Sequence, residues 1–169
     1  GVDLPVGLAL RDSAAQLIAC GITTAYLGVT LSWEPGLRSL DDWRALKAAL
    51  SEARARAATD LRVHLRFEAD NFDALEDALA GIADGSVHLL GFNDHTMAIV
   101  RKLGDPVHVA KYAGRAGMKA DAFRALAESA QLSEADAHIL LGMMQNKDAE
   151  AVRHHGQSLQ LATQWVNAL

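Results

Sequence analysis

The sequence predicts an α/β fold in which helices alternate with parallel strands. Three segments show the β-branched or alternating pattern of a strand, at about residues 22–30, 61–68 and 87–93. Each follows a segment with the spacing of an amphipathic helix, at about residues 8–20, 39–58 and 71–84. Strands that alternate with helices usually lie parallel and are joined by right-handed crossovers. We therefore expect three to four parallel strands with covering helices.

Local signals place the ends of these helices. Ser39-x-x-Asp42 resembles a capping box and opens the second helix. Asp70 or Asn71 can cap the third helix, and Gly85 ends it. The apolar stripe of the third helix has helical spacing and consists of Phe72, Leu75, Leu79 and Ile82.

Beyond His95 the regular alternation stops. Residues from about 96 to 131 predict only short helical pieces, broken at Gly104–Pro106 and Gly114–Gly117. The rest predicts a helix capped at Ser133, a helix at about 148–164 and the opening of a strand at 166–169. This stretch is far longer than an ordinary crossover between strands. We therefore expect a helical insertion at about 96–165, serving as a lid or a subunit contact, within one segment that covers residues 1–169.

Composition and charge argue against several classes of protein. Half of the 169 residues are hydrophobic, and the formal net charge is -5. No basic stripe is present, which disfavours a nucleic-acid partner. No apolar stretch approaches the roughly 20 residues of a membrane span, and no signal-peptide pattern is found. We expect a cytoplasmic protein with no membrane partner, whose single cysteine, Cys20, packs on the apolar face of the first helix.

The strand at 61–68 carries the most informative pattern. Its apolar face holds Val63, Leu65 and Phe67, and its polar face holds His64, Arg66 and Glu68. A buried parallel strand is usually apolar on both faces. If the next strand ends near His95, a carboxylate and an imidazole meet at the carboxyl ends of adjacent strands, where parallel α/β proteins place their chemistry. A structural salt-bridge row inside the sheet fits the same pattern.

Other chemical motifs are absent from the sequence. It contains no dinucleotide-binding, Walker A or nucleophile-elbow motif. Three isolated histidines and one adjacent pair are expected to be structural or exposed: His88, His108, His138 and His154-His155. Glu68 and His95 are therefore the candidate ligands, since carboxylate and imidazole are ordinary ligands of zinc, manganese and iron.

Three motifs resemble the amidohydrolase superfamily in their order and spacing: Ala19-Cys-Gly-Ile-Thr-Thr24, His64-Leu-Arg-Phe-Glu68 and Asn93-Asp-His-Thr96. The branch they resemble most is the ribose methylphosphonate triphosphate diphosphatases of bacterial phosphonate (carbon–phosphorus lyase) metabolism. The similarity runs from about residue 10 to the C-terminus and is strongest between about residues 16 and 96.

This resemblance implies a partial (β/α)₈ barrel of the TIM type with one or two divalent metals (zinc, manganese or iron) at the carboxyl ends of the strands. Glu68 matches the bridging carboxylate of the family and His95 the first of its two later histidines, so both are expected to bind metal. Arg66 and His64 share the face of Glu68 and are expected to bind a small anionic or phosphorylated substrate. The implied reaction is attack of an activated water on a carbonyl or phosphoryl centre. Within this branch, a ribose phosphonate triphosphate is hydrolysed and diphosphate is released.

The sequence departs from the family in two respects. Met97-Ala-Ile follows Asp94-His95-Thr96 where the phosphonate enzymes usually carry a Pro-Gly-Gln-like turn, which indicates a diverged paralogue. The first-strand histidines of the family would precede Gly1, and its remaining histidine and aspartate ligands would follow Leu169. We therefore expect a central barrel fragment that is inactive alone, binds metal weakly or not at all, and needs the remaining barrel segments or a homo-oligomeric partner.

Two other functions stay open from the residues alone. The chain fits a non-catalytic α/β domain whose polar strand row is structural and whose insertion binds a partner. It also fits a small module that binds a phosphate ligand through Arg66 and the helix N-termini near Asp70.

Overall fold

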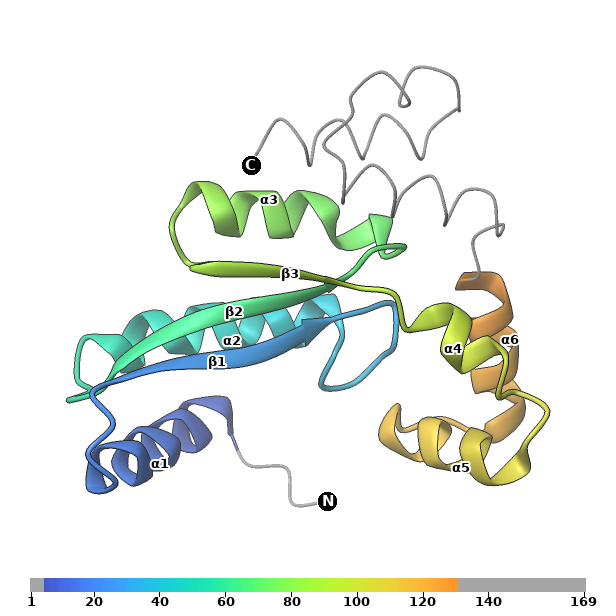
Figure 1. Ribbon diagram of the computed structural model, residues 1–169, viewed down its shortest axis with the longest axis horizontal. Helices are drawn as coiled ribbons and strands as arrows, with labels where there is room; N and C mark the ends of the chain where they lie inside the picture. Colours follow the sequence, from blue (N-terminus) through green and yellow to red (C-terminus); the bar gives the residue numbers. More distant parts are fainter. Residues whose placement is uncertain (1–4, 131–169) are drawn as a thin grey trace.

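Three parallel strands form one sheet in the order β1 (Thr24–Leu31), β2 (Asp60–Glu68) and β3 (Leu89–Asn93). The computed structural model describes residues 5–130 (Figure 1). All three predicted strands are confirmed, with ends that move by one or two residues. The α/β fold class with parallel strands is confirmed as well, in an open sheet.

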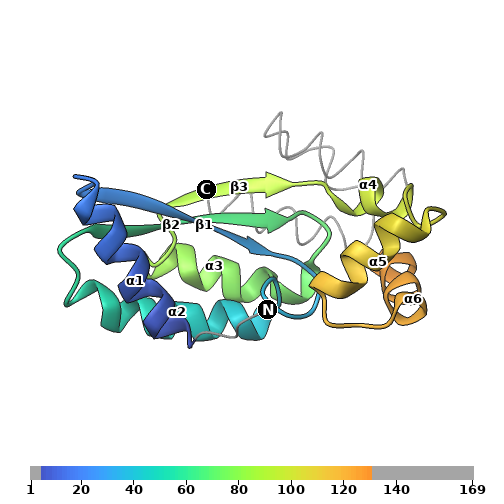
Figure 2. The same ribbon diagram turned by 90° about the horizontal axis from the view of Figure 1, so that it is seen from below.

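The helices α1 (Val6–Ala19), α2 (Leu40–Arg54) and α3 (Leu75–Ala83) lie on one face of this sheet (Figure 2). The apolar side chains of β2 point into that layer, and each is at most 1% exposed: Leu61, Val63, Leu65 and Phe67. They form one core with buried residues of the helices, among them Trp43, Leu50 and Leu75. Burial of this apolar set on one face leaves the alternate residues of each strand on the opposite, open face.

The second helix begins as its capping box predicts. The Ser39 hydroxyl accepts a hydrogen bond from the backbone N–H of Asp42 at 3.2 Å. The third helix differs from its prediction, because residues Phe72–Ala74 form a 3-10 turn, η1, before α3 begins. The Asn71 side chain makes no capping bond, and the Asp70 side chain bonds Thr96 instead. Gly85, at a φ of +74°, ends the helix as predicted.

Three short helices stand at the carboxyl end of the sheet: α4 (Thr96–Val100), α5 (Pro106–Arg115) and α6 (Ala120–Ala130) (Figure 1). They have a core of their own, which includes Ile99, Val109, Phe123 and Ala127. The predicted short pieces are therefore confirmed, although α5 runs through Gly114 and breaks only after Arg115. The remainder of the predicted insertion, including the cap at Ser133, the later helix and strand, and His138, His154 and His155, lies outside the described residues.

The prediction for Cys20 is wrong. Cys20 is the C-terminal cap of α1 and is exposed rather than packed. A search of residues 5–130 for a helix with the length and apolar character needed to cross a membrane finds none.

Candidate functional site

The candidate site lies where β2 and β3 end. Glu68 is the last residue of β2 and pairs in register with Asn93, the last residue of β3. The carboxylate of Glu68 is buried, with the residue only 2% exposed. His95 follows β3 by two residues, as the N-terminal cap of α4. The fold therefore brings together two groups that lie 27 residues apart in sequence.

Glu68 and His95 contact each other directly, as the sequence predicts. The Nδ1 atom of His95 lies 3.2 Å from Oε2 of Glu68. The backbone N–H of His95 donates to Oε1 of the same carboxylate. A carboxylate accepts hydrogen bonds, so the Nδ1 atom facing it carries the proton. The Nε2 atom of the neutral ring then keeps its lone pair, on a side chain that is 46% exposed.

This arrangement has a defined chemical use. A carboxylate that holds one ring nitrogen fixes the tautomer and orientation of an imidazole. Nε2 of His95 is thereby presented as a metal ligand or as a proton acceptor. Each oxygen of Glu68 has a second lone pair, so its bonds to His95 leave it able to coordinate a metal.

A hydrogen-bond network of Trp33, Thr96 and Asp70 adjoins this pair. The indole Nε1 of Trp33 donates to the hydroxyl oxygen of Thr96 at 2.7 Å, and Thr96 bonds the Asp70 carboxyl. Thr96 is 2% exposed and follows His95 directly in sequence. The network therefore fixes the turn that carries His95 against the end of β1.

Burial raises the pKa of Asp70 to about 6. The bond from Thr96 opposes this rise, while the charges of Glu68 and Asp94 add to it. One oxygen of Asp70 is buried without a hydrogen-bond partner among the described residues. The acidic groups beside Glu68 thus favour a proton, or another positive charge, at this end of the sheet.

The loop after β1 attaches the short helices to the sheet. Glu34 is 2% exposed and accepts hydrogen bonds from Nη1 of Arg38 at 3.3 Å and from Nε of Arg115 at 3.0 Å. The rings of Trp33 and Phe123 pack with centroids 6.0 Å apart. These contacts hold α5 and α6 at the carboxyl end of the sheet (Figure 1).

Arg66 and His64, the predicted substrate-binding residues, lie on the open face of the sheet. Arg66 is exposed and His64 is half-buried. Within residues 5–130, neither side chain has a hydrogen-bond or ion-pair partner. Glu68 pairs with His95 rather than with Arg66, so His64, Arg66 and Glu68 form no ion pair with one another; the ion pair within β2 joins Arg62 to Asp60 at 2.8 Å, at the start of the strand.

The donor set of Glu68 and His95 fits a divalent metal in kind, since both groups are ordinary ligands. It is incomplete in number, because residues 5–130 contain no cluster of three or more potential metal ligands. Besides His64 and His95, residues 5–130 contain two histidines, and both have side-chain partners. His88 contacts Arg54 at 2.6 Å, and His108 contacts Asp105 at 2.6 Å.

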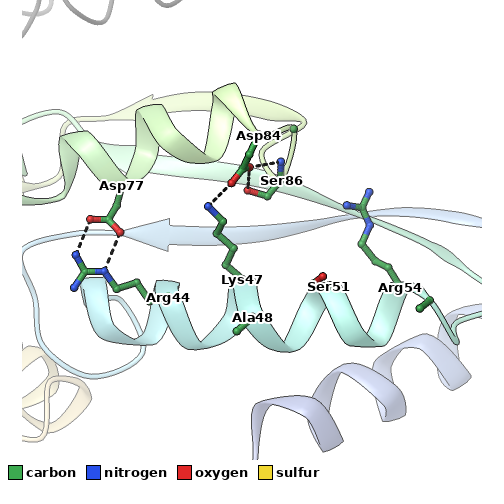
Figure 3. Close-up of a pocket in the computed structure, with 10 residues that line it drawn as sticks. Arg44, Lys47, Ala48, Ser51, Arg54, Asp77, Asp84 and Ser86 are labelled. Atoms are coloured by element: carbon green, nitrogen blue, oxygen red, sulfur yellow. Dashed lines mark hydrogen bonds and ion pairs between the residues drawn. The ribbon is translucent and has the colours of Figure 1, made fainter.

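Two of the hollows on the described chain are large enough to consider for a ligand. A groove of about 890 Å³ runs between α2 and α3 (Figure 3). Ion pairs cross it, from Arg44 to Asp77 at 2.8 Å and from Lys47 to Asp84 at 2.6 Å. These charges neutralise each other, so the groove is an exposed contact between two helices, and we assign no ligand to it.

The second cavity, of about 670 Å³, lies at the carboxyl ends of β1 and β2. Its wall includes Trp33, Glu34, Asp70 and Asn71, and none of its described lining residues is Lys, Arg or His. An anionic substrate would find no cation there, whereas the open face of β2 offers Arg66.

Sequence reasoning missed the partners of Thr96 and Glu34. Trp33 and Thr96 are 63 residues apart, and Glu34 and Arg115 are 81 apart. No local period links such positions, so only the packed fold reveals them. The sequence indicates Asp70 as a possible helix cap near a phosphate-binding helix N-terminus, and not as a partner of Thr96.

Comparisons of the chain with protein-family models, with curated proteins and with solved structures find no match.

Proposed function

We propose that this chain carries part of the active site of a metal-dependent hydrolase of the amidohydrolase type. The observation that carries the proposal is the contact between Glu68 and His95 at the carboxyl ends of neighbouring parallel strands. Metal-dependent barrels place their ligands at this end of the sheet. The sequence resemblance assigns metal-binding roles to the same two residues.

In this proposal, Nε2 of His95 would hold a divalent metal together with ligands from outside residues 5–130. The carboxylate of Glu68, which lies on the Nδ1 side of the ring, would orient His95 and could hold a second metal through its remaining lone pairs. When bound, the metal supplies Lewis-acid chemistry to a water molecule or to the substrate. Glu68 holds the imidazole of His95 in the tautomer with Nδ1 protonated. The network of Trp33, Thr96 and Asp70 holds the turn in place.

The substrate in this proposal is a small phosphorylated anion. Arg66 and Glu68 share the open face of β2, with Arg66 two residues before the end of the strand. A guanidinium on this face suits phosphoryl oxygens, because its planar set of donors matches their geometry. Hydrolysis of a ribose phosphonate triphosphate in phosphonate metabolism is the reaction that the resemblance favours.

We also propose that the sheet is part of a (β/α)₈ barrel. Among residues 5–130, helices cover one face of the sheet only, and the opposite face carries the polar residues His64, Arg66 and Glu68, as expected if that face lines a barrel interior near a site. The outer edges of β1 and β3 are unpaired among the described strands. Remaining barrel segments or a second copy of the chain would pair with these edges.

A non-catalytic role is the second candidate. Both oxygens of Glu68 already bond His95, and residues 5–130 supply no third ligand. A structural carboxylate–imidazole pair in a phosphate-binding or interaction domain would look the same in these respects.

The test is to purify the product of the complete reading frame that encodes this chain, and to measure its metal content and its hydrolysis of phosphate esters, phosphoanhydrides and amides. Glu68→Gln and His95→Asn are expected to lose metal and activity together. His108→Asn is the matched control, because His108 contacts Asp105 through the same ring nitrogen at an exposed position. If the two site variants keep full metal content and activity, the proposal is wrong.

A further inference from the structure

The open face of β3 contains a glycine at the point where a side chain of β2 crosses it. A Cβ atom at Gly91 would lie 2.8 Å from Nε2 of His64, closer than real Cβ contacts come. Gly28 lies beside His64 in register on the other neighbouring strand, and a Cβ there would meet nothing within 4 Å. The imidazole of His64 therefore leans over β3 and away from β1, and it can do so only because residue 91 has no side chain.

This placement brings His64 toward Arg66. In the register of β2 and β3, Gly91 is the partner of Arg66, and Leu89 is the partner of His64. The ring of His64 therefore lies over the partner of Arg66 and not over its own partner. On the other side of Arg66, Thr30 is its partner in β1. A hydroxyl, a guanidinium and an imidazole thus occupy one row across the open face, next to the row that contains Glu68.

The three groups share the ability to donate a hydrogen bond. In residues 5–130, His64 and Arg66 have no partner that uses their donors. Glycine inside a strand weakens it and often marks the close approach of another group. Here that approaching group is the His64 ring, and glycine keeps it beside the one exposed guanidinium of the row.

We propose that Gly91 is a positioning residue that holds His64 beside Arg66, so that the row Thr30, Arg66 and His64 binds the phosphoryl oxygens of an anionic ligand. This inference deepens the proposed function and rests on its anionic substrate. It does not need the metal, because all three groups are donors on the sheet itself.

The experiment measures the affinity of the 169-residue chain for inorganic diphosphate by calorimetry, in buffer without divalent metal. Gly91→Ala is expected to weaken binding about tenfold, the loss of one hydrogen bond to a charged group. His64→Ala is expected to weaken it to the same degree. The double variant with both changes is expected to bind as His64→Ala alone does, because Gly91 acts only through His64. Gly28→Ala is the matched control and should bind as the unchanged chain does.

Circular dichroism and thermal unfolding are recorded for each variant. If Gly91→Ala alone fails to fold, the double variant is expected to fold, because removing the imidazole removes the clash. The inference is overturned if the unchanged chain does not bind diphosphate at millimolar concentration, if Gly91→Ala binds normally, or if the two changes add in the double variant. Metal content is measured separately. If the protein binds no metal, diphosphate binding can still support this inference, and if diphosphate does not bind, the metal proposal can still be correct.

Discussion

Replacing Asp70 with asparagine is expected to stabilise the folded chain at alkaline pH and to change its stability little in acid. The carboxyl has a pKa of about 6 in the fold, against 3.8 for an unperturbed aspartate, chiefly because it is buried. The folded state therefore keeps a proton in a range of pH where the unfolded chain has released it. Stability that is present below about pH 4 is lost as the pH rises through about 6.

The magnitude follows from the difference between the two pKa values. At 1.36 kcal/mol for each pKa unit, the difference between the two pKa values corresponds to a loss of about 3 kcal/mol of folding stability when Asp70 is fully ionised. Asp70 is only half-buried and keeps part of its hydration, which reduces this effect. We expect Asp70→Asn to raise the free energy of unfolding at pH 8 by about 1 to 2 kcal/mol more than at pH 4. The amide oxygen of asparagine still accepts the bond from Thr96, so that contact survives.

The assay is urea unfolding of both proteins at pH 4 and pH 8, followed by circular dichroism. Asp73→Asn is the matched control, because Asp73 lies three residues further along at an exposed position. A gain for Asp70→Asn that is equal at the two pH values, or a loss at pH 8, would refute the argument that burial of an ionised carboxyl destabilises this end of the sheet.

Two further changes test the contacts around the site. Thr96→Val leaves the buried N–H of Trp33 without its acceptor and is expected to lower the free energy of unfolding by about 1 to 3 kcal/mol. Thr96→Ser keeps a hydroxyl at this position and is expected to restore most of the loss. If urea unfolding shows that the valine variant is as stable as the unchanged chain, the assigned bond is contradicted. Arg115→Met removes one of the two cations that neutralise buried Glu34 and is expected to lower the free energy of unfolding by about 1 to 3 kcal/mol. Arg101→Met, at an exposed position, is expected to change this free energy little. Similar values for the two variants would show that the ion pair does not stabilise the fold.

Much of the fold can be predicted from periodic patterns. The alternation along 61–68 places Val63, Leu65 and Phe67 in the core, since adjacent side chains of a strand point to opposite faces. The meeting of Glu68 and His95 follows from the same logic, because parallel neighbouring strands end at the same edge of a sheet. Both results depend only on local spacing and on strand direction.

The parts that could not be predicted depend on packing between distant segments. The lean of His64 over Gly91 depends on the register of β2 against β3, which the sequence does not specify. A 3-10 turn precedes α3 where the sequence predicts a helix start; its cap residue, Asn71, makes no capping bond, and Asp70 bonds Thr96. Cys20 is exposed, although the apolar pattern places it on the packed face of the first helix.

The most direct test of the central claim is a crystal structure of the protein grown with zinc or manganese, with the metal located by its anomalous scattering. We expect a peak at about 2.0 to 2.2 Å from Nε2 of His95, with the carboxylate of Glu68 still bonded to Nδ1 of the same ring. A structure with the metal elsewhere, or with Nε2 of His95 facing only solvent at saturating metal, would contradict the assignment of this carboxylate–imidazole pair to a metal-dependent hydrolase.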